Sequence, residues 1–592
     1  MSSPDHVDDA SPVPPPKARS SLTSLFILHV LTRFLTFALN QLLLRTTTPT
    51  AFGVTAIQFE LVFGGVVLLL REGVRGVVVR LGVGLMGDGS NTMKGTLQRS
   101  REIQSLTNLT HLPLLAGAPI LIAVSVLYAS FLASSETASQ PHFVEAVVLY
   151  SFAGLLELGC EPAYGLATST LRTDIRVRAE GLGVTLKSVT TFLILYFSHH
   201  SHITGDARQY ALLAYAFGQL AYSITLTLSY ATAFKDKSLS LGWRKLENNT
   251  AEATSLIPTY FIPQSDKLVL SSFSVSLAAQ GGYAIAANYG SLVARLVFLP
   301  IEESLRLFFS RILALPSPAS PSQSPSTEPS SPSRSMSSLL HAHGSLATLL
   351  KSQLSLSLIL VTFAPIYLPY VLPLLLPPAF LQETNAAELL QAWLWCLPVL
   401  SLNGGLESFV AVTAETGDIA RQSLFMFLFS LLYVLSSLVF YSYFRLGDAA
   451  LIYANIVNLL ARIAFCLSFV RAFFRDQYRG RVSAGAAGAA GPKAGEVNPF
   501  AFRAGEWLPD PRVVAACVLS YAVLSSPALV PPPPATTSSP MRHLLSKAVL
   551  GYVGIGGVLG LGCLYVWWAT AGRVLKITFG GERGARRGQK ED

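Results

Sequence analysis

Charged residues are scarce in this chain, and their scarcity excludes an ordinary soluble protein. Only 13% of the 592 residues are Asp, Glu, Lys or Arg, whereas 51% are hydrophobic; a soluble domain carries about 25% charged residues. A soluble protein of this length would also divide into several domains with polar seams between them. The hydrophobic residues instead form recurring runs of about 18–25, which is long enough to cross a bilayer. The composition therefore predicts a protein that crosses a membrane many times.

Motifs with a chemical role are equally scarce. The five cysteines all fall within hydrophobic runs, which argues against a disulfide framework. We find no metal-ligand triad, no nucleotide-binding motif, no nucleophile elbow and no paired carboxylates in an outside loop. The glycine-rich stretch 551–562 follows no strand, so it indicates close helix packing rather than a phosphate-binding loop. We therefore expect no catalytic residue, metal site, cofactor, nucleotide or nucleic-acid partner.

Fourteen hydrophobic runs are candidate transmembrane helices. Helix is the expected structure because barrel strands would alternate over about ten residues, and these runs do not. The first run is too long for a signal peptide, and no small-residue cleavage site follows it. The stretch 368–378 predicts a proline-broken end of the ninth span. The runs lie near 22–44, 51–70, 113–133, 143–170, 183–198, 209–232, 267–287, 290–312, 347–376, 386–413, 421–444, 449–472, 511–530 and 546–572.

The distribution of basic residues supports this map. Lys and Arg favour the cytoplasmic side of a membrane. With a cytoplasmic N-terminus, 35 of the 43 Lys and Arg residues fall on that side and three fall within spans. A wrong number of spans would scramble this alternation, so we expect both termini to be cytoplasmic. The outside loops hold only Arg45, Arg208, Arg445, Arg542 and Lys547.

An internal comparison indicates a duplicated unit. The stretch 51–75 can be laid on 282–306 without a gap, and charged residues then coincide at two positions. The two spans involved are six apart, so both copies keep the same orientation in the membrane. We therefore predict two six-helix lobes followed by two extra helices. The charges at the cytoplasmic ends of the two spans are Arg71, Glu72, Arg75, Glu302, Glu303 and Arg306, and solvated helix ends with local ion pairs would explain them.

Composition also sets the expected domain boundaries. Proline-rich, polar stretches are typical of disorder, and basic tails are typical of segments near anionic headgroups. The predicted segments are a disordered N-terminus (1–20), an N-terminal lobe (21–232), a cytoplasmic linker (233–266), a C-terminal lobe (267–472) with a disordered Pro/Ser loop (315–337), a cytoplasmic loop (473–510), two further spans (511–572) and a basic cytoplasmic tail (573–592).

Polar and charged residues within the spans are the candidates for a site. A charge at such depth costs about 2.5 kcal/mol or more and is a functional hypothesis by default. On the first span, Arg33 and Asn40 are seven residues apart. On the twelfth span, Asn458 and Arg462 follow Asn455 by three and seven residues. Each set therefore shares a helix face. The alternative is structural: amides bridge helices, and arginines pair with Glu60 or Glu407. The candidates for lining a substrate cavity are Arg33, Asn40, Gln41, Gln58, Glu60, Arg295, Asn403, Glu407, Asn455, Asn458 and Arg462.

Several stretches resemble the eukaryotic Rft family. They are "LTRFLTFALNQLLLR", "TPTAFGVTAIQFEL", "LLLREGVR", "CEPAY", "RVRAEG", "NYGSLVARLVFLPIEES" and "ANIVNLLARI". The resemblance covers roughly 22–570 and departs from the family at the Pro/Ser insertion, an Ala/Gly insertion and a glycine-rich loop near 81–95. It implies a fold similar to that of bacterial lipid-linked-precursor flippases and multidrug exporters, with two lobes around a central cavity.

The resemblance also implies a function and its partners. The family is associated with translocation of a dolichyl-diphosphate oligosaccharide, which carries five mannoses, across the endoplasmic reticulum membrane during N-glycosylation. Cations would bind the diphosphate, and amides or hydroxyls would bind the sugars. The expected partners are this lipid and the membrane itself, and the sequence leaves the oligomeric state open.

Three other functions stay open at this point. A cation-coupled exporter of small molecules would share the fold and would use intramembrane acids such as Glu60 or Glu407 as proton sites. An accessory factor would serve the same pathway without moving the lipid. A membrane glycosyltransferase would usually carry acidic catalytic residues in its first lumenal loop, and that loop is only "RTTTPT" here.

Overall fold

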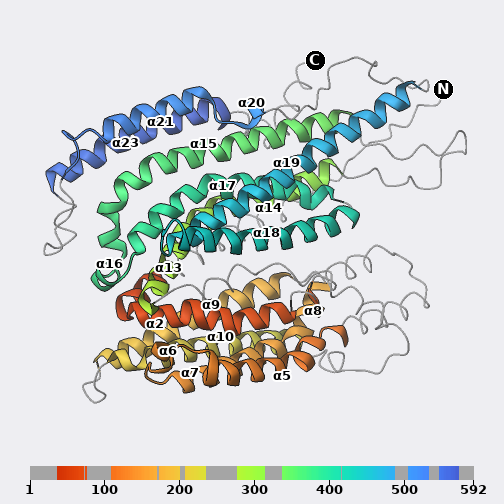
Figure 1. Ribbon diagram of the computed structural model, residues 1–592. Helices are drawn as coiled ribbons and strands as arrows, with labels where there is room; N and C mark the ends of the chain where they lie inside the picture. The colour runs from red at the N-terminus through yellow and green to blue at the C-terminus, as the bar shows by residue number, and fades with distance from the viewer. Residues whose placement is uncertain are drawn as a thin grey trace, which may run out of the picture. The chain divides into compact units, whose positions relative to one another are not determined.

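The structure is a computed structural model, and its regular secondary structure, within the described residues, is helical (Figure 1). Among the described residues, ten helices are long and apolar enough to cross a membrane. They confirm the predicted class, an all-helical protein with many membrane spans. The described residues are 37–71, 74–75, 108–169, 173–200, 207–234, 276–313, 336–414, 416–486, 504–531 and 546–572.

The predicted total of fourteen spans is not confirmed. Ten predicted runs correspond to the ten long helices, whereas the run at 511–530 forms a shorter helix, Pro511–Leu524. The run at 22–44 is described only from residue 37. The ten long helices are Pro49–Arg71, Leu112–Leu132, Phe143–Ala167, Ile175–Ser198, Ala211–Ala233, Ser338–Leu375, Ala386–Thr413, Arg421–Ser442, Ala449–Arg479 and Lys547–Thr570.

The boundary between the seventh and eighth predicted runs, near 287–290, does not interrupt the helical hydrogen bonding. Helical hydrogen bonds run across it: the Ser291 N–H donates to the Ala287 carbonyl at 3.0 Å, and the Arg295 N–H donates to the Ser291 carbonyl at 3.0 Å. The Ser291 hydroxyl also donates to Ala287 within the helix, so this polar residue needs no turn to satisfy it. The consecutive elements are α13 (Leu277–Gly290), η6 (Ala294–Phe298) and α14 (Leu299–Ile312).

The ninth span ends within the predicted proline-rich stretch 368–378, although the helix passes three prolines first. Helix α15 (Met336–Leu375) continues through Pro365, Pro369 and Pro373 and ends just before Pro377. Prolines four residues apart lie on one helix face, so their missing hydrogen bonds all weaken the same side. The helix therefore bends instead of ending, and Figure 1 shows α15 curving toward α16 (Pro378–Glu383).

The chain divides into two compact units. Unit 1 comprises Met1–Thr47 and Val77–Thr250, and unit 2 comprises Thr48–Gly76 and Ala251–Asp592. The helix Pro49–Arg71, which the sequence map assigns to the N-terminal lobe, contacts α13 within unit 2. The predicted lobe boundaries themselves stay a prediction.

Unit 1 is built around α10, which packs against both α7 and α9. Gly218 allows the close approach to α9, because a Cβ at this position would meet the Thr191 hydroxyl and the Lys187 carbonyl. The elements of unit 1 are a helix at 37–46, α5 (Leu112–Leu127), η2 (Tyr128–Leu132), α6 (Ser135–Ala138), α7 (Phe143–Gly159), α8 (Glu161–Ser169), α9 (Thr173–His200), η3 (Ala207–Tyr210) and α10 (Ala211–Ala233).

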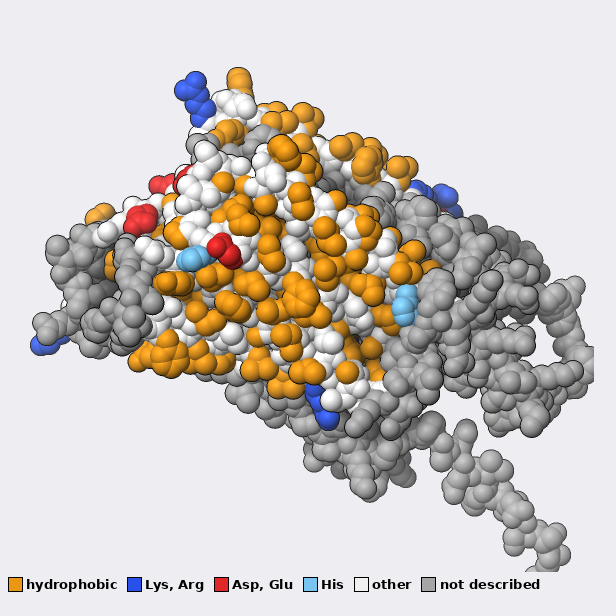
Figure 2. Space-filling model, turned by 90° about the horizontal axis from the view of Figure 1, so that it is seen from below, with side chains coloured by type: hydrophobic (Ala, Val, Ile, Leu, Met, Phe, Trp, Pro, Cys, Tyr) orange, Lys and Arg blue, Asp and Glu red, His pale blue; other side chains and the backbone are white. Residues whose placement is uncertain are grey.

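The surface of unit 1 is suited to lipid. Large hydrophobic side chains are exposed on α5 and α7, among them Leu115, Val126 and Val148, each about 60% exposed. The face drawn in Figure 2 is mostly hydrophobic and carries few charged side chains. Such a surface would be unfavourable in water and is expected for helices that face acyl chains.

Unit 2 is organised around α17, which contacts α13, α14, α15 and α19. Phe309, Phe409 and Phe474 are fully buried in the core between these helices. The elements of unit 2 beyond those already given are α2 (Pro49–Gly53), η1 (Val54–Gly64), α17 (Ala386–Thr413), α18 (Thr416–Ser442), α19 (Ala449–Ala486), α20 (Ala504–Trp507), α21 (Pro511–Leu524), α23 (Lys547–Trp567) and η7 (Trp568–Gly572).

Two glycines let α2 and α13 cross in direct backbone contact. A Cβ at Gly53 would meet the Leu277 carbonyl and the Gly281 nitrogen, and a Cβ at Gly281 would meet the Pro49 carbonyl. Small residues permit this kind of close crossing between membrane helices. The first turn of α2 therefore lies directly against the first turn of α13 within unit 2.

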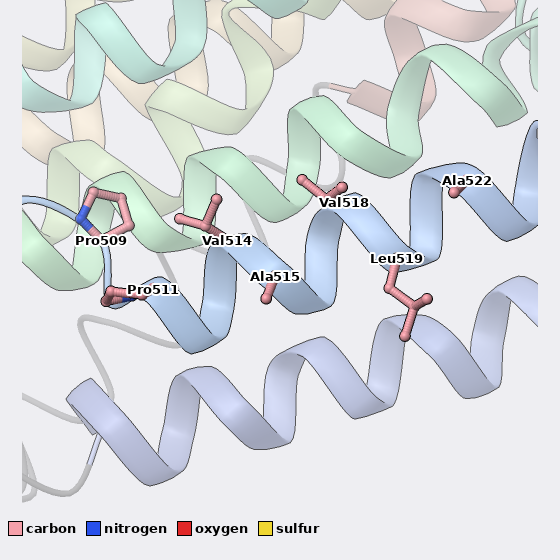
Figure 3. Close-up of a pocket in the computed structure, with 7 residues that line it drawn as sticks. All are labelled: Pro509, Pro511, Val514, Ala515, Val518, Leu519 and Ala522. Atoms are coloured by element: carbon pink, nitrogen blue, oxygen red, sulfur yellow. The ribbon is translucent and has the colours of Figure 1, made fainter.

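The last two helices, α21 and α23, pack against α15. Tyr370 donates to the Pro531 carbonyl at 2.7 Å, and Tyr552 donates to the Leu524 carbonyl at 2.8 Å. The first bond ties the segment after α21 to the bent end of α15, and the second ties α23 to the end of α21. A shallow apolar groove of about 640 Å³ runs along α21 between Pro509 and Ala522 (Figure 3).

Candidate functional site

An ion pair joins α17 and α19 inside unit 2. The Arg462 guanidinium donates to both carboxylate oxygens of Glu407, at 2.9 and 3.1 Å. The Asn403 side-chain amide donates to the same carboxylate at 3.0 Å. Each charged side chain is 26% exposed. The predicted structural pairing of an arginine with Glu407 is therefore confirmed for Arg462.

The predicted polar stripe on the twelfth span faces α17 at two of its positions. Arg462 reaches Glu407, and two turns earlier the Asn455 amide lies 4.0 Å from the Cys396 sulfur. Asn458, between them, is only 4% exposed. The spacing rule thus predicted correctly that this set shares a helix face.

Two adjacent glycines let polar side chains approach the α17 backbone. A Cβ at Gly404 would meet the Glu302 carboxylate, and a Cβ at Gly405 would lie 2.9 Å from Gln353 Oε1. Gln353 is 2% exposed, and its amide has no hydrogen-bond partner among the described residues. Glu302 therefore points at the backbone of a neighbouring span, whereas the sequence suggested a solvated helix end.

Further candidates lie on the two helices that cross at Gly53 and Gly281, which begin with α2 and α13. Gln58 donates to Gln280 at 3.0 Å, and both side chains are buried. Arg295 donates to the carbonyl and side-chain oxygens of Asn288, at 2.7 and 2.6 Å. Glu60 is exposed on η1.

The other candidates are spread over the chain. Asn40 and Gln41 are half-buried on the helix 37–46 of unit 1, whereas Arg33 lies outside the described residues. Arg71 and Arg75 are half-buried, and Arg306 is exposed. Glu72 and the side chain of Glu303 also lie outside the described part.

Sequence reasoning missed a polar network inside unit 1. Glu157 on α7 accepts hydrogen bonds at Oε1 from the Gln219 amide (2.8 Å) and the Ser223 hydroxyl (3.2 Å), both on α10. The Lys187 ammonium on α9 donates to the other end of the Gln219 amide at 2.6 Å. The signal was present in the sequence, because Glu157 lies inside the run 143–170 and Lys187 is the only charged residue of the run 183–198.

These arrangements define the class of the protein. Ionisable residues within spans are rare, and they usually mark the pathways of substrates, ions or protons. Here they occur in both units of a helical protein with at least ten long apolar helices. The molecule is a multi-pass membrane protein.

The comparison with protein families identifies the chain more closely. The family model described as Rft protein matches residues 17–569, so the chain belongs to the Rft family, as its sequence motifs predict. A relative from Eremothecium gossypii is 28% identical over 488 residues, which covers 78% of this chain and 83% of the relative. A Saccharomyces cerevisiae relative is 29% identical over 504 residues, covering 78% and 84%. Both are named Man(5)GlcNAc(2)-PP-dolichol translocation protein RFT1.

A solved structure shares the fold. The inward closed conformation of the lipid II flippase MurJ aligns with a TM-score of 0.56 over 92% of this chain and 98% of that chain, at 11% sequence identity. The predicted similarity to bacterial lipid-linked-precursor flippases is confirmed at the level of the fold.

Proposed function

We propose that this protein moves a dolichyl-diphosphate oligosaccharide with five mannoses from the cytosolic to the lumenal leaflet of the endoplasmic reticulum membrane. The observation that carries the proposal is the match, over about 78% of the chain, to relatives named for translocation of this lipid. The fold shared with a flippase for another diphosphate-linked lipid agrees with it. The substrate would then be a lipid with an anionic, sugar-bearing headgroup.

The polar residues within the spans suit such a headgroup. A diphosphate requires cations, and guanidinium groups bind phosphate oxygens with paired donors. Sugars require amides and hydroxyls. Unit 2 supplies Arg295 and the amide pair Gln58–Gln280, and unit 1 supplies Asn40 and Gln41. In this proposal the protein performs no covalent chemistry, needs no cofactor, and keeps both termini in the cytoplasm.

The cation-coupled exporter receives less support. It requires an intramembrane acid that binds and releases a proton. Glu407, one of the two acids considered for this role, accepts two hydrogen bonds from Arg462 and one from Asn403. Both carboxylate oxygens therefore already bind an arginine of the neighbouring helix.

Reconstitution tests the proposal directly. Purified full-length protein in liposomes should move the five-mannose dolichyl-diphosphate oligosaccharide between leaflets faster than protein-free liposomes do. A lectin added outside reports how much lipid stays accessible. Cells that lack the protein should accumulate the same lipid and underglycosylate their proteins.

The two measurements separate the remaining functions. Accumulation in cells without any translocation in liposomes would indicate an accessory factor. Normal levels of the lipid in cells that lack the protein would contradict the pathway assignment. Transfer of a sugar to the lipid by the purified protein would indicate a glycosyltransferase.

A further inference from the structure

A lysine lies near the middle of a membrane span in unit 1. Lys187 is on the helix Ile175–Ser198, about halfway between its ends. Its ammonium donates to Gln219 Oε1 at 2.6 Å, and no second hydrogen bond or ion pair of this side chain occurs among the described residues. An ammonium has three donors, so two are left for another acceptor.

The network around Lys187 runs from the interior of the unit to its surface. Glu157 is buried at 9% exposure, whereas Gln219 and Lys187 are both half-buried. The amide of Gln219 separates the two charges, since its nitrogen donates to the carboxylate and its oxygen accepts from the ammonium. Lys187 is therefore held in place without a direct ion pair to Glu157.

The exposed apolar stripe of α9 lies on another side of the helix. Leu182, Leu186 and Leu193 are 56%, 44% and 43% exposed, and their spacing of four and seven puts them on one stripe. Lys187 is about 100° around the helix from Leu186. It lies one turn from Gly183 and Thr191, which are buried against α10. Lys187 thus lies at the edge of the α9–α10 contact, outside the apolar stripe.

A charged amine at this depth is stable only beside water or an anion, because exposure to acyl chains costs about 2.5 kcal/mol or more. We propose that Lys187 faces a water-accessible passage and binds the phosphate groups of the transported lipid. The chemistry would be charge-assisted hydrogen bonding from the two remaining ammonium donors to phosphate oxygens. Gln219 and Glu157 would act as positioning residues that fix the ammonium. The identity of the anion rests on the proposed function; the accessibility of the site does not.

Cysteine labelling tests the accessibility. Lys187→Cys and Leu186→Cys are compared in full-length protein in liposomes, with a permanently charged methanethiosulfonate reagent. The five native cysteines are buried, so their labelling should be slow. We expect the Lys187→Cys variant to react at least tenfold faster than the Leu186→Cys variant. Thr190→Cys, one turn further along the same face, serves as a second probe if the first variant is not produced. Equally slow labelling of all three variants would overturn the proposal.

Binding tests the ligand. Lys187→Met should weaken binding of the five-mannose dolichyl-diphosphate oligosaccharide to the purified protein about tenfold, and Lys187→Arg should stay within about threefold of the unmodified protein. Arg176→Met is the matched control, because Arg176 is on the same helix and its side chain pairs with Glu180 at 3.0 Å. Its affinity should be unchanged.

The outcomes separate this inference from the proposed function. If the unmodified protein moves the lipid and Lys187→Met binds and moves it equally well, Lys187 has no part in binding. If the unmodified protein neither binds nor moves the lipid while the Lys187→Cys variant labels rapidly, the passage stands and the proposed substrate is wrong.

Discussion

The two units each contain an intramembrane acid and base, but the two networks are connected differently. In unit 2 Arg462 binds Glu407 directly through two contacts of 2.9 and 3.1 Å. In unit 1 the ammonium of Lys187 and the carboxylate of Glu157 meet only through the Gln219 amide. In the direct pair the two charges compensate each other, whereas the amide bridge keeps the ammonium and the carboxylate apart. The two networks of acidic and basic side chains therefore differ in structure, and we expect them to differ in function.

Breaking the direct pair should have the largest effect on folding. Arg462→Met removes the cation that pairs with Glu407 and leaves a partly buried carboxylate without this compensation, which costs about 3 kcal/mol or more. We expect a severalfold loss of folded protein in the membrane fraction, measured by size-exclusion chromatography of a fluorescent fusion.

The double variant Arg462→Met/Glu407→Gln provides the control. With the carboxylate replaced by a neutral amide, the Asn403 amide still finds an oxygen acceptor, and most of the abundance should return. If the double variant is as poorly produced as the single one, the arginine matters for packing rather than for charge.

Removing the amide bridge should have an intermediate effect. Gln219→Leu deletes two hydrogen bonds to charged groups, which together contribute about 2 kcal/mol within a membrane. We expect a lower melting temperature in detergent than for Gln140→Leu, a control at an exposed glutamine of the same unit. A melting temperature equal to that of the control would show that the bridge does not hold the three helices together.

The smallest effect is expected at the edge of the network. Ser223→Ala removes one of the two hydrogen bonds to Glu157 Oε1 and keeps the amide bridge. The cost should be about 0.5–1 kcal/mol, visible as a small shift in melting temperature. Binding of the lipid should stay unchanged, because Lys187 keeps its contact with Gln219; a clear loss of affinity would place Ser223 itself at the ligand.

Much of the architecture could be predicted because the bilayer imposes a length on each apolar run. Ten of the predicted spans correspond to long apolar helices. The end of the ninth span in the proline-rich stretch 368–378 was also predicted correctly. The boundary between the seventh and eighth runs was not, because the helix continues across 287–295. Inside a span no water is available to hydrogen-bond the backbone N–H and C=O groups. A continuous helix satisfies these groups internally, so it is more stable than a break.

The site was predicted less completely, for a different reason. Helical spacing predicted that Asn455 and Arg462 share a face, and charge pairing predicted a partner for Glu407. Neither rule says which helices are neighbours. The contact of Glu302 with Gly404 and the bridge through Gln219 depend on packing between residues that are far apart in the sequence.

The glycine crossing between α2 and α13 has a consequence for synthesis. Gly53 and Gly281 contact each other's backbones although more than 200 residues separate them. At translation rates of about 5–20 residues per second, the second helix emerges roughly 10–45 s after the first. During that time the start of the earlier helix is in the membrane without its partner, with bare backbone at Pro49 and Gly53 that only the later helix covers. Packing of the segment Thr48–Gly76 into unit 2 must therefore wait for the synthesis of α13, and truncated chains would be open to quality control at this surface.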